Sequence, residues 1–143
     1  MLETFNLDGK VVLITGGGTG LGLAMVRALA RAGANLALAG RRAAPIEGAA
    51  KEVVDLGREA LVVTADVTDS KQVDQLIATT LDRFGHIDVL INNAGAVQEN
   101  VRKPLWDITD DEWNLVMNVN LSGAFFCARA VSKPMSERGK GKI

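Results

Sequence analysis

A run of glycines near the start of the chain is the segment best suited to chemistry. Positions 15–22 read TGGGTGLG and lie between the apolar run Val11–Ile14 and a stretch with helical spacing. Glycines at such a turn let the backbone approach a pyrophosphate without Cβ clashes, and the free N–H groups of the following helix attract its negative charge. The segment therefore predicts a dinucleotide-binding loop, with a purely structural glycine turn as the alternative. The predicted binding residues are Thr15, Gly16, Gly18, Thr19, Gly20, Leu21 and Gly22.

Two consecutive arginines follow the second apolar run, Leu36–Leu38. In dinucleotide-binding folds an acidic residue at this place holds the 2′-hydroxyl of the cofactor ribose, whereas an arginine accommodates a 2′-phosphate. The sequence reads Ala39-Gly40-Arg41-Arg42, without a carboxylate, and Arg41 offers a forked cation for phosphate. Arg41 and Arg42 therefore favour NADP(H) as the cofactor. NAD(H) stays open because the glycine loop contains no basic residue, and a solvated basic loop is the alternative without a binding role.

Polar residues also follow the third and fourth apolar runs. Asp66 and Val67 come after Leu61–Val63, where a carboxylate could accept a hydrogen bond from an adenine amino group or could instead cap the next turn or helix. The fourth run ends in Asn92-Asn93-Ala94-Gly95. In a doubly wound sheet, ligands bind outside the carboxyl ends of the strands, where strand order reverses. We therefore expect this segment to face the same crevice as the glycine loop, and a plain asparagine turn is the alternative.

The elements that must position these residues are short apolar runs that alternate with segments at helical spacing. The runs are Val11–Ile14, Leu36–Leu38, Leu61–Val63 and Ile87–Ile91. Strands buried on both faces read as continuous apolar runs, and strands that alternate with helices imply right-handed crossovers. The sequence therefore predicts an α/β fold, a Rossmann-type doubly wound parallel sheet with its strands in the spatial order third, second, first, fourth.

Periodicity predicts which face each of the three intervening helices buries. The expected buried residues are Leu21, Ala24, Met25, Ala28 and Leu29 in the first helix, Ile46, Ala49, Ala50, Val53 and Val54 in the second, and Val73, Leu76, Ile77, Thr80, Leu81 and Phe84 in the third. Gly33 is expected to end the first helix, and Asp69 or Ser70 to cap the third.

A long helical region is expected after the fourth strand, starting near Thr109 or Asp110. Asn118-Val119-Asn120 are poor helix formers in its middle and predict a kink. Pro134 is expected to disturb the last turns. The residues expected to face inward are Trp113 and Val116 before the kink and Leu121, Ala124, Phe125, Ala128, Val131 and Met135 after it. The expected end of the helix is at Gly139 and Gly141, and Lys142-Ile143 are expected to begin a fifth strand.

Composition and charge argue against several functional classes. The chain has 143 residues, 48% hydrophobic and 23% charged, which predicts one globular domain. A formal net charge of −1 without a long basic run argues against nucleic acid as a partner. No apolar stretch approaches the roughly 18 residues of a membrane span, and the N-terminal MLETFNLDGK does not resemble a secretion signal. With a single Cys127 and a single His86, we expect a cytoplasmic protein without an internal disulfide or a metal site.

Taken in order, these motifs resemble those of the short-chain dehydrogenases/reductases, in the shorter branch of that family. The resemblance covers Leu7 to Ile143, and the glycine motif together with NNAG is specific, whereas neither would be alone. An unrelated or flavin-binding Rossmann protein is disfavoured by NNAG. A softer likeness is to the gluconate or glucose dehydrogenases and 3-oxoacyl-carrier-protein reductases of that family. The matching segments are TGGGTGLG at 15–22, GRR at 40–42, Asp66-Val67, NNAG at 92–95 and NVNLSG at 118–123.

The resemblance implies NAD(P)-dependent hydride transfer between nicotinamide and a small-molecule alcohol or carbonyl. It implies that the glycine loop holds the pyrophosphate and that Asp66, beside Val67, holds the adenine. Asn120 matches the family's catalytic asparagine, which orders a water in a proton relay; alternatively, it only satisfies backbone groups freed by the kink. The long helix pair is often an oligomer interface in this family, so the complete protein is expected to be a homo-oligomer. The residues that the resemblance places on the ribose side of the cofactor are Asn92, Ala94 and Gly95.

The family chemistry also needs a Ser and a Tyr-x-x-x-Lys pair, in which the Tyr exchanges a proton as a pKa-tuned acid–base group. The sequence contains no Tyr, and the Ser is expected just after the fifth strand, which begins at Lys142. We therefore expect residues 1–143 to be the dinucleotide-binding portion of a single domain whose C-terminal part is missing, and to be inactive alone. The alternatives are a non-catalytic NADP-binding module and an inactive truncated fragment.

Overall fold

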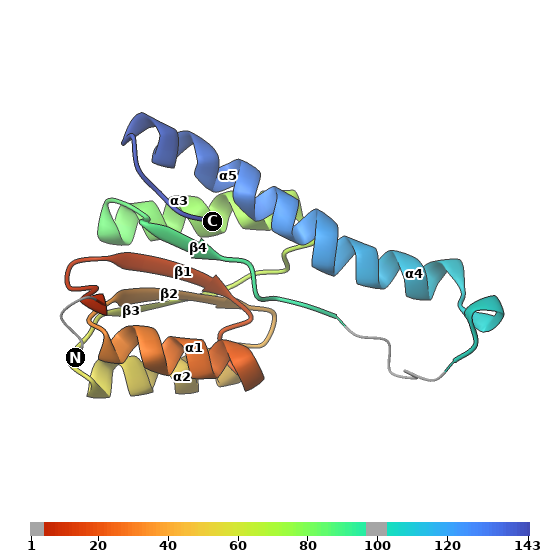
Figure 1. The fold of residues 1–143 in the computed structure, drawn as a ribbon, viewed down its shortest axis with the longest axis horizontal. Coiled ribbons are helices and arrows are strands. Elements are labelled where there is room, and N and C mark those ends of the chain that lie inside the picture. The colour runs from red at the N-terminus through yellow and green to blue at the C-terminus, as the bar shows by residue number, and fades with distance from the viewer. Residues whose placement is uncertain (1–4, 97–102) are drawn as a thin grey trace.

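The computed structural model describes residues 5–96 and 103–143, and its central feature is a four-stranded parallel sheet (Figure 1). The strands lie in the order β3-β2-β1-β4, so the direction of winding reverses between β1 and β4. The predicted doubly wound α/β fold is confirmed. The elements in chain order are β1 (Val11–Thr15), α1 (Gly20–Arg31), β2 (Asn35–Gly40), α2 (Ala43–Asp55), β3 (Ala60–Thr64), α3 (Ser70–Phe84), β4 (Val89–Ile91), η2 (Leu105–Asp107), α4 (Asp110–Met117), η3 (Asn118–Ser122) and α5 (Gly123–Glu137).

The central strands are buried on both faces, which explains their continuous apolar runs. Along β1, Val12 and Ile14 pack with residues of α1 and α2, whereas Leu13 packs with residues of α3 and α5 on the other face. Figure 1 shows the same three layers, with α1 and α2 on one side of the sheet and α3 and α5 on the other. The strand β3 lies at one edge and is only half-buried.

The strand β4 forms the other edge, and the last residues of the described chain pair with it. The N–H of Lys142 donates to the carbonyl oxygen of Asp88 at 3.0 Å, and the N–H of Leu90 donates to the carbonyl oxygen of Lys142 at 2.9 Å. These bonds make a parallel bridge between Lys142 and Val89. The predicted beginning of a fifth strand is therefore confirmed.

The buried side chain of Asp88 joins three elements at the amino end of the sheet. Its Oδ2 accepts from the N–H of Val11 at 2.9 Å and lies 3.1 Å from Nε2 of His86, while its Oδ1 accepts from Arg138 at 3.2 Å. Burial acts to raise the pKa of the Asp88 carboxyl, but the hydrogen bonds from Val11 and Arg138, together with the electrostatic effect of His86 and Lys10, outweigh it and hold that pKa below its ordinary value. The carboxylate thus holds the start of β1 and the end of α5 against the start of β4.

The buried faces of α1 and α2 differ in part from the predicted ones. The buried residues of α1 are Gly22, Val26 and Ala30, which are spaced four residues apart. Because α1 is apolar around most of its circumference, periodicity could not select its inner face. The third helix matches its prediction, and Asp69 caps it by accepting from the N–H of Lys71. The side chains predicted to be buried but found exposed are Leu21, Ala24, Ala28 and Val54.

The predicted kink in the long helical region is a π-helical turn, η3, between α4 and α5. The helix starts at a capping box in which Thr109 and Glu112 exchange hydrogen bonds. The predicted start near Thr109 is therefore confirmed. A π turn accommodates an extra residue, so the face read from uninterrupted helical spacing is out of phase in the turn and directly after it. Leu121 and Phe125, predicted to face inward, are more than half exposed, and so is Trp113, which lies before the turn. Val131 and Met135 are buried as predicted, and the other buried residues are Val119, Gly123 and Cys127.

The unit from α4 to α5 is one long rod that projects beyond the sheet (Figure 1). The predicted disturbance at Pro134 is wrong in that α5 continues through it to Glu137, after which Gly139 has a φ of +67°. The rod, Asp110–Glu137, is long and apolar enough to cross a membrane by length and composition alone. Val131 and Met135 on its inner face pack in the core of the sheet and α3.

Candidate functional site

The loops at the carboxyl ends of all four strands converge on one cavity of about 550 Å³. It lies where the strand order reverses, between β1 and β4, as parallel sheets of this kind require for a ligand crevice. The predicted site residues that line it are Gly16, Gly18, Thr19, Leu21, Gly22, Arg41, Arg42, Asp66, Val67, Ala94 and Gly95. The predicted residues that do not line it are Thr15, Gly20, Asn92 and Asn120. The lining residues absent from the predicted set are Ala39, Gly40, Pro45, Ile46, Ala65, Asn93 and Val119.

Thr15 connects the glycine loop to β4 instead of lining the cavity. Its side chain is buried, and its hydroxyl accepts from the N–H groups of Asn93 at 3.1 Å and Ala94 at 3.0 Å. The hydroxyl also lies 3.5 Å from the carbonyl oxygen of Ile91. A single hydroxyl therefore sets the position of the cavity-lining backbone after β4.

Asn93, rather than the predicted Asn92, is the asparagine that shapes the cavity. Its Nδ2 donates to the carbonyl oxygens of Thr15 at 2.9 Å and Gly16 at 3.0 Å, whereas Asn92 is exposed. Neighbouring residues at a strand end point to opposite sides, so only one asparagine of the NNAG motif can reach the glycine loop. The NNAG motif indicated that Asn92 and Asn93 lie near the cavity. The side toward which each of them points depends on the register of the strand in the sheet.

Two glycines of the loop are needed for this close packing. Gly16 has a φ of +71°, and a Cβ on it would lie 2.9 Å from Nδ2 of Asn93. A Cβ on Gly22 would collide with the carbonyl oxygen of Gly16. The two glycines therefore let the loop, the start of α1 and Asn93 pack together at the wall of the cavity.

The electrostatics of this backbone favour an anion. The first turn of α1 contains no acidic residue, and Thr19 at its N-cap makes no side-chain capping bond. The unpaired N–H groups and the positive end of the helix dipole consequently face the cavity without internal compensation. The start of α1 thus has the electrostatic character by which helix N-termini attract phosphate groups.

Arg41 and Arg42 add two cations to the same cavity. Both side chains are exposed and line it where β2 runs into α2, and neither makes a hydrogen bond or ion pair within residues 5–96 and 103–143. The end of β2 carries no carboxylate, and the first turn of α2 has no acidic residue. The two guanidinium groups are therefore available to an anionic ligand.

Asp66 takes the turn-forming role that was one of its two predicted alternatives. Its Oδ1 accepts from the N–H of Thr68 at 2.9 Å and from the Thr68 hydroxyl at 2.8 Å. The N–H of Asp66 donates to Gln72 at 3.0 Å. Asp66 nevertheless lines the cavity beside Val67, and a carboxylate has further lone pairs with which to accept a bond. The turn positions the carboxylate at the cavity rim.

Asn120 lies in the π turn next to the cavity-lining Val119. Its Oδ1 accepts from the N–H of Ala96 at 2.7 Å, and its Nδ2 donates to the carbonyl oxygen of Ala96 at 3.0 Å. The amide therefore binds the segment after β4. The alternative prediction, that it satisfies the backbone groups freed by the kink, is wrong. An Asn amide offers two donor hydrogens and an acceptor with two lone pairs, so one of each stays available to a water.

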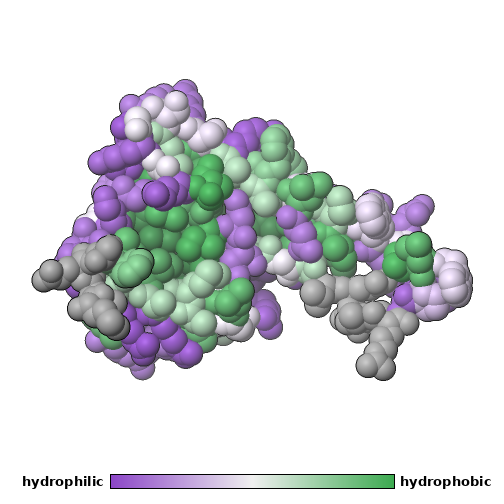
Figure 2. All heavy atoms as spheres, viewed as in Figure 1, coloured by the Kyte–Doolittle hydropathy of each residue, from purple (hydrophilic) through white to green (hydrophobic). Residues whose placement is uncertain are grey.

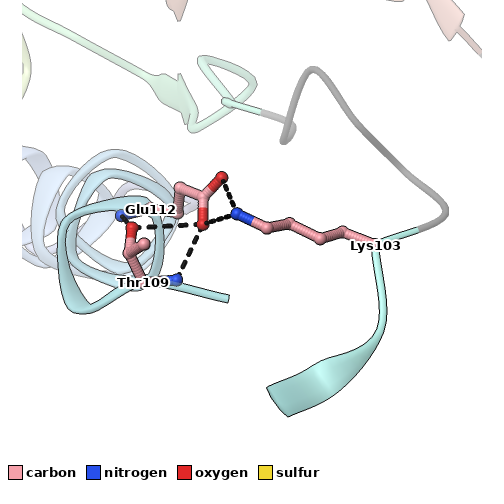
Figure 3. A network of polar contacts seen from close by, with 3 residues as sticks. All are labelled: Lys103, Thr109 and Glu112. Atoms are coloured by element: carbon pink, nitrogen blue, oxygen red, sulfur yellow. Dashed lines mark hydrogen bonds and ion pairs between the residues drawn. The ribbon is translucent and has the colours of Figure 1, made fainter. Parts of the chain in front are cut away.

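A second polar network holds the start of α4 (Figure 3). Glu112 accepts from Nζ of Lys103 at 2.9 and 2.8 Å, and its Oε2 accepts from the N–H of Thr109 at 2.7 Å. The Thr109 hydroxyl accepts in return from the N–H of Glu112 at 3.2 Å. Lys103 thus extends the capping box and ties the preceding chain to the helix that leads to Asn120.

The described residues contain no group of three or more His, Cys, Asp or Glu side chains that could hold a metal ion. Cys127, the single cysteine, is buried, and burial raises the pKa of its thiol to about 11. The thiol is therefore protonated at neutral pH and packs as a small apolar group.

The chain matches known proteins over most of its length. The family model described as short chain dehydrogenase matches residues 10–143. The chain is 38% identical over 96% of its length to a 3-oxoacyl-[acyl-carrier-protein] reductase of Synechocystis, of which it covers 55%. It is 37% identical over 99% of its length to gluconate 5-dehydrogenase of Gluconobacter oxydans, of which it covers 54%. A metagenomic short-chain oxidoreductase in complex with NADP superimposes with a TM-score of 0.88 at 30% identity, over 94% of this chain and 60% of that one. The chain thus spans about half the length of the curated relatives it matches.

Proposed function

The chain belongs to the short-chain dehydrogenase family, and from this premise we propose that it binds NADP(H) as the cofactor-binding portion of an oxidoreductase. The complete protein would transfer a hydride between the nicotinamide and a small-molecule alcohol or carbonyl. The observation that carries the proposal is the cavity at the switch point of the sheet, where the start of α1 and two arginines present positive charge to one space. The cofactor supplies the hydride chemistry when bound.

The glycine loop fits the pyrophosphate of the cofactor. The places of the missing Cβ atoms at Gly16 and Gly22 are already taken by Asn93 and by the loop's own carbonyl oxygen. The loop backbone can therefore be this close only with glycines, and the helix that it leads into presents its N-terminal N–H groups beside the cavity, where a phosphate would bind. The residues proposed to bind the cofactor here are Gly16, Gly18, Thr19, Gly20, Leu21 and Gly22, with Thr15 holding the loop.

A 2′-phosphate is the group that Arg41 and Arg42 suit best. An arginine binds phosphate through two parallel hydrogen bonds, whereas the ribose 2′-hydroxyl of NAD(H) is ordinarily held by a carboxylate at this position. The absence of that carboxylate supports NADP(H) over NAD(H). Asp66 and Val67 are proposed at the adenine. The residues proposed at the ribose side are Asn92, Ala94 and Gly95, with Asn93 positioning their backbone.

Asn120 is proposed as the catalytic asparagine that orders a water in the proton relay. Ala96 takes one donor and one acceptor of its amide, which fixes the orientation of the group and leaves a donor and an acceptor for a water molecule. The side chain is exposed, so a water can reach it. In this proposal Asn120 holds the water in place and does not itself exchange a proton.

A non-catalytic NADP-binding module is the second candidate function, because the residues that line the cavity suit nucleotide binding by themselves. The proton exchange of this family depends on a Tyr, so a complete protein without that Tyr would bind the nucleotide and do no more. Turnover distinguishes the two candidates, because only the oxidoreductase would oxidise NADPH in the presence of carbonyl compounds. Both candidates require nucleotide binding.

The proposed homo-oligomer is supported by apolar residues exposed on the rod formed by α4, η3 and α5. Figure 2 shows hydrophobic residues at the surface along this rod. Trp113, Leu115, Leu121 and Phe125 are each more than half exposed, and an exposed apolar strip of this kind marks a protein interface. We further propose a cytoplasmic location for the complete protein, where its nucleotide cofactor is abundant.

Titration with NADPH and NADH, followed by calorimetry, tests the proposed function. We expect NADPH to bind with a lower Kd than NADH, and 2′-phospho-AMP to compete with NADPH more effectively than AMP does. Equal Kd values for the two dinucleotides would contradict the assignment of the arginines. Absence of binding by both would contradict the proposed function itself.

A further inference from the structure

Gly123 lies where the π turn ends, in contact with a cavity residue that is distant in sequence. Its N–H donates to the carbonyl oxygen of Asn118, five residues earlier, which is the bond that closes the π turn. A Cβ on Gly123 would lie 2.7 Å from Cγ2 of Val67, 3.1 Å from its Cβ and 3.4 Å from its carbonyl oxygen. Real Cβ atoms essentially never approach a neighbour within 3.0 Å. The helix can therefore lie this close to Val67 only because residue 123 has no side chain.

This contact joins two walls of the cavity that come from different parts of the chain. Val67 follows β3 and Val119 lies in the π turn; both line the cavity, and both are 8% exposed. They belong to one buried cluster that also contains Cys127, the next inward-facing residue of α5 after Gly123. Val119 and Gly123 lie four residues apart on the buried side of the π turn. The approach of Gly123 to Val67 thus sets the distance between the two walls.

We propose that Gly123 is a positioning residue, which by its contact with Val67 sets the width of the nucleotide cavity and the reach of Asn120 to Ala96. The inference rests on the proposed nucleotide-binding function for its effect on affinity. Asn120 and Gly123 lie in and directly after the same π turn. A displacement of the turn from Val67 therefore also changes the hydrogen bonds that Asn120 makes to Ala96.

A methyl group at position 123 has only two places to go. Either Val67 moves toward the cavity, or the π turn moves away from Val67 and carries Val119 and Asn120 with it. Close-packed interiors do not absorb an added methyl group without such a shift. Both movements change the space available to the nucleotide, so a Gly123→Ala substitution acts on binding without altering a residue that lines the cavity.

Gly123→Ala is the test, with Gly48→Ala as the matched control. Gly48 is also helical, but a Cβ on it would meet nothing within 4 Å, and it does not line the cavity. In the full-length protein we expect Gly123→Ala to raise the Kd of NADPH roughly tenfold, and Gly48→Ala to leave it unchanged. Equal affinities for the two variants would overturn the proposed control of the cavity width.

Removal of the opposing methyl groups should rescue the variant. In the Val67→Ala/Gly123→Ala double variant, the side chain that meets the new methyl group is shortened, so we expect the Kd to fall back toward that of Val67→Ala alone. A purely local destabilisation of the helix by alanine would not respond to Val67. If the double variant binds no better than Gly123→Ala, the inference is wrong. If Gly123→Ala does not fold, recovery of the fold in the double variant supports the inference and its failure overturns it.

The side-chain amide signals of Asn120 provide a readout that needs no nucleotide. They can be identified in an ¹⁵N-labelled sample by their loss in Asn120→Ala. We expect them to shift in Gly123→Ala, to stay in place in Gly48→Ala and to return in the double variant. If the wild-type protein does not bind NADPH, the proposed function fails, whereas unchanged Asn120 signals in Gly123→Ala refute the positioning role.

Discussion

Nδ2 of Asn93 lies 2.9 Å from the carbonyl oxygen of Thr15 and 3.0 Å from that of Gly16, so one side-chain amide fastens the end of β4 to the glycine loop. The two carbonyl groups belong to the turn that leads into α1, where regular backbone pairing stops. The shape of the proposed pyrophosphate cradle therefore depends on a residue that comes more than seventy positions later in the chain.

Asn93→Ala should destabilise the protein and weaken nucleotide binding together. The substitution leaves two half-buried carbonyl groups without their donor, which costs about 1–3 kcal/mol in the free energy of unfolding. Urea denaturation followed by circular dichroism measures this change. Asn92→Ala is the control for stability, because Asn92 is exposed and does not line the cavity. Equal losses of stability in the two variants would refute the role given to Asn93.

Arg41→Asp should reverse the preference between the two dinucleotides. The substitution removes a charged hydrogen-bond donor for a 2′-phosphate, and it introduces a carboxylate that repels phosphate and can accept from a 2′-hydroxyl. We expect the Kd of NADPH to rise about ten- to a hundredfold, and that of NADH to fall. Arg31→Asp carries the same charge change at an exposed site outside the cavity and serves as the control. An unchanged ratio of the two Kd values in Arg41→Asp would remove Arg41 from cofactor selection.

Asn120→Ala, made in the full-length enzyme, should lower kcat with little change in KM. A group that orders a water for proton transfer acts on the chemical step and not on substrate binding. A loss of at least roughly tenfold in kcat is expected from the range typical of acid–base assistance. Steady-state kinetics with NADPH and a carbonyl substrate measures it. Wild-type kcat in a correctly folded Asn120→Ala variant would exclude Asn120 from the proton relay.

Asp88→Asn should make the protein less stable at neutral pH and less sensitive to acid. The pKa of Asp88 is lower in the folded state than its ordinary value, so the ionised carboxylate stabilises the fold above the unfolded-state pKa of about 3.9. This contribution is lost as the pH falls through the lower, folded-state pKa. We expect Asp88→Asn to lose about 1–3 kcal/mol at pH 7, with a smaller further loss below pH 4 than the wild type shows.

Chemical denaturation of the wild type and Asp88→Asn at pH 7 and pH 3 measures both effects. Asp82→Asn is a matched control, because Asp82 is an exposed aspartate on α3 with no hydrogen bond or ion pair to the rest of the described chain. Parallel pH profiles for wild type and Asp88→Asn would show that the bonds of Asp88 to Val11 and Arg138 do not govern acid stability.

The strand order and the position of the cavity could be predicted because they depend on local signals. Four continuous apolar runs separated by helical segments leave few arrangements other than a parallel, doubly wound sheet. In such a sheet the carboxyl ends of the strands meet at one edge, so residues that directly follow a strand must lie together. Arg41, Asp66 and Gly95 each follow a strand closely, and all three line the cavity as this rule requires.

The helix faces were harder because apolar residues surround the helices. In α1 periodicity favoured Leu21, but Leu21 is exposed and Gly22 is buried, because a Cβ at position 22 would collide with the carbonyl oxygen of Gly16. Beyond Asn118 the π turn changed the phase, so Phe125 is exposed and Cys127 is buried. A kink could be predicted from Asn118-Val119-Asn120, but its π geometry could not. Helix propensities show where a helix is weak, but they do not show which hydrogen-bonding pattern the backbone adopts there.

Residue types and their order were thus sufficient for the fold class, the family resemblance and the identity of most side chains around the cavity. Which asparagine of NNAG reaches the glycine loop, where the amide of Asn120 binds, and how closely Gly123 approaches Val67 became known from the folded chain alone. These relations join residues that lie far apart in sequence, and their geometry is set by strand register and by close packing between elements. Local sequence patterns carry no information on either, because both arise only when the sheet and its helices pack together.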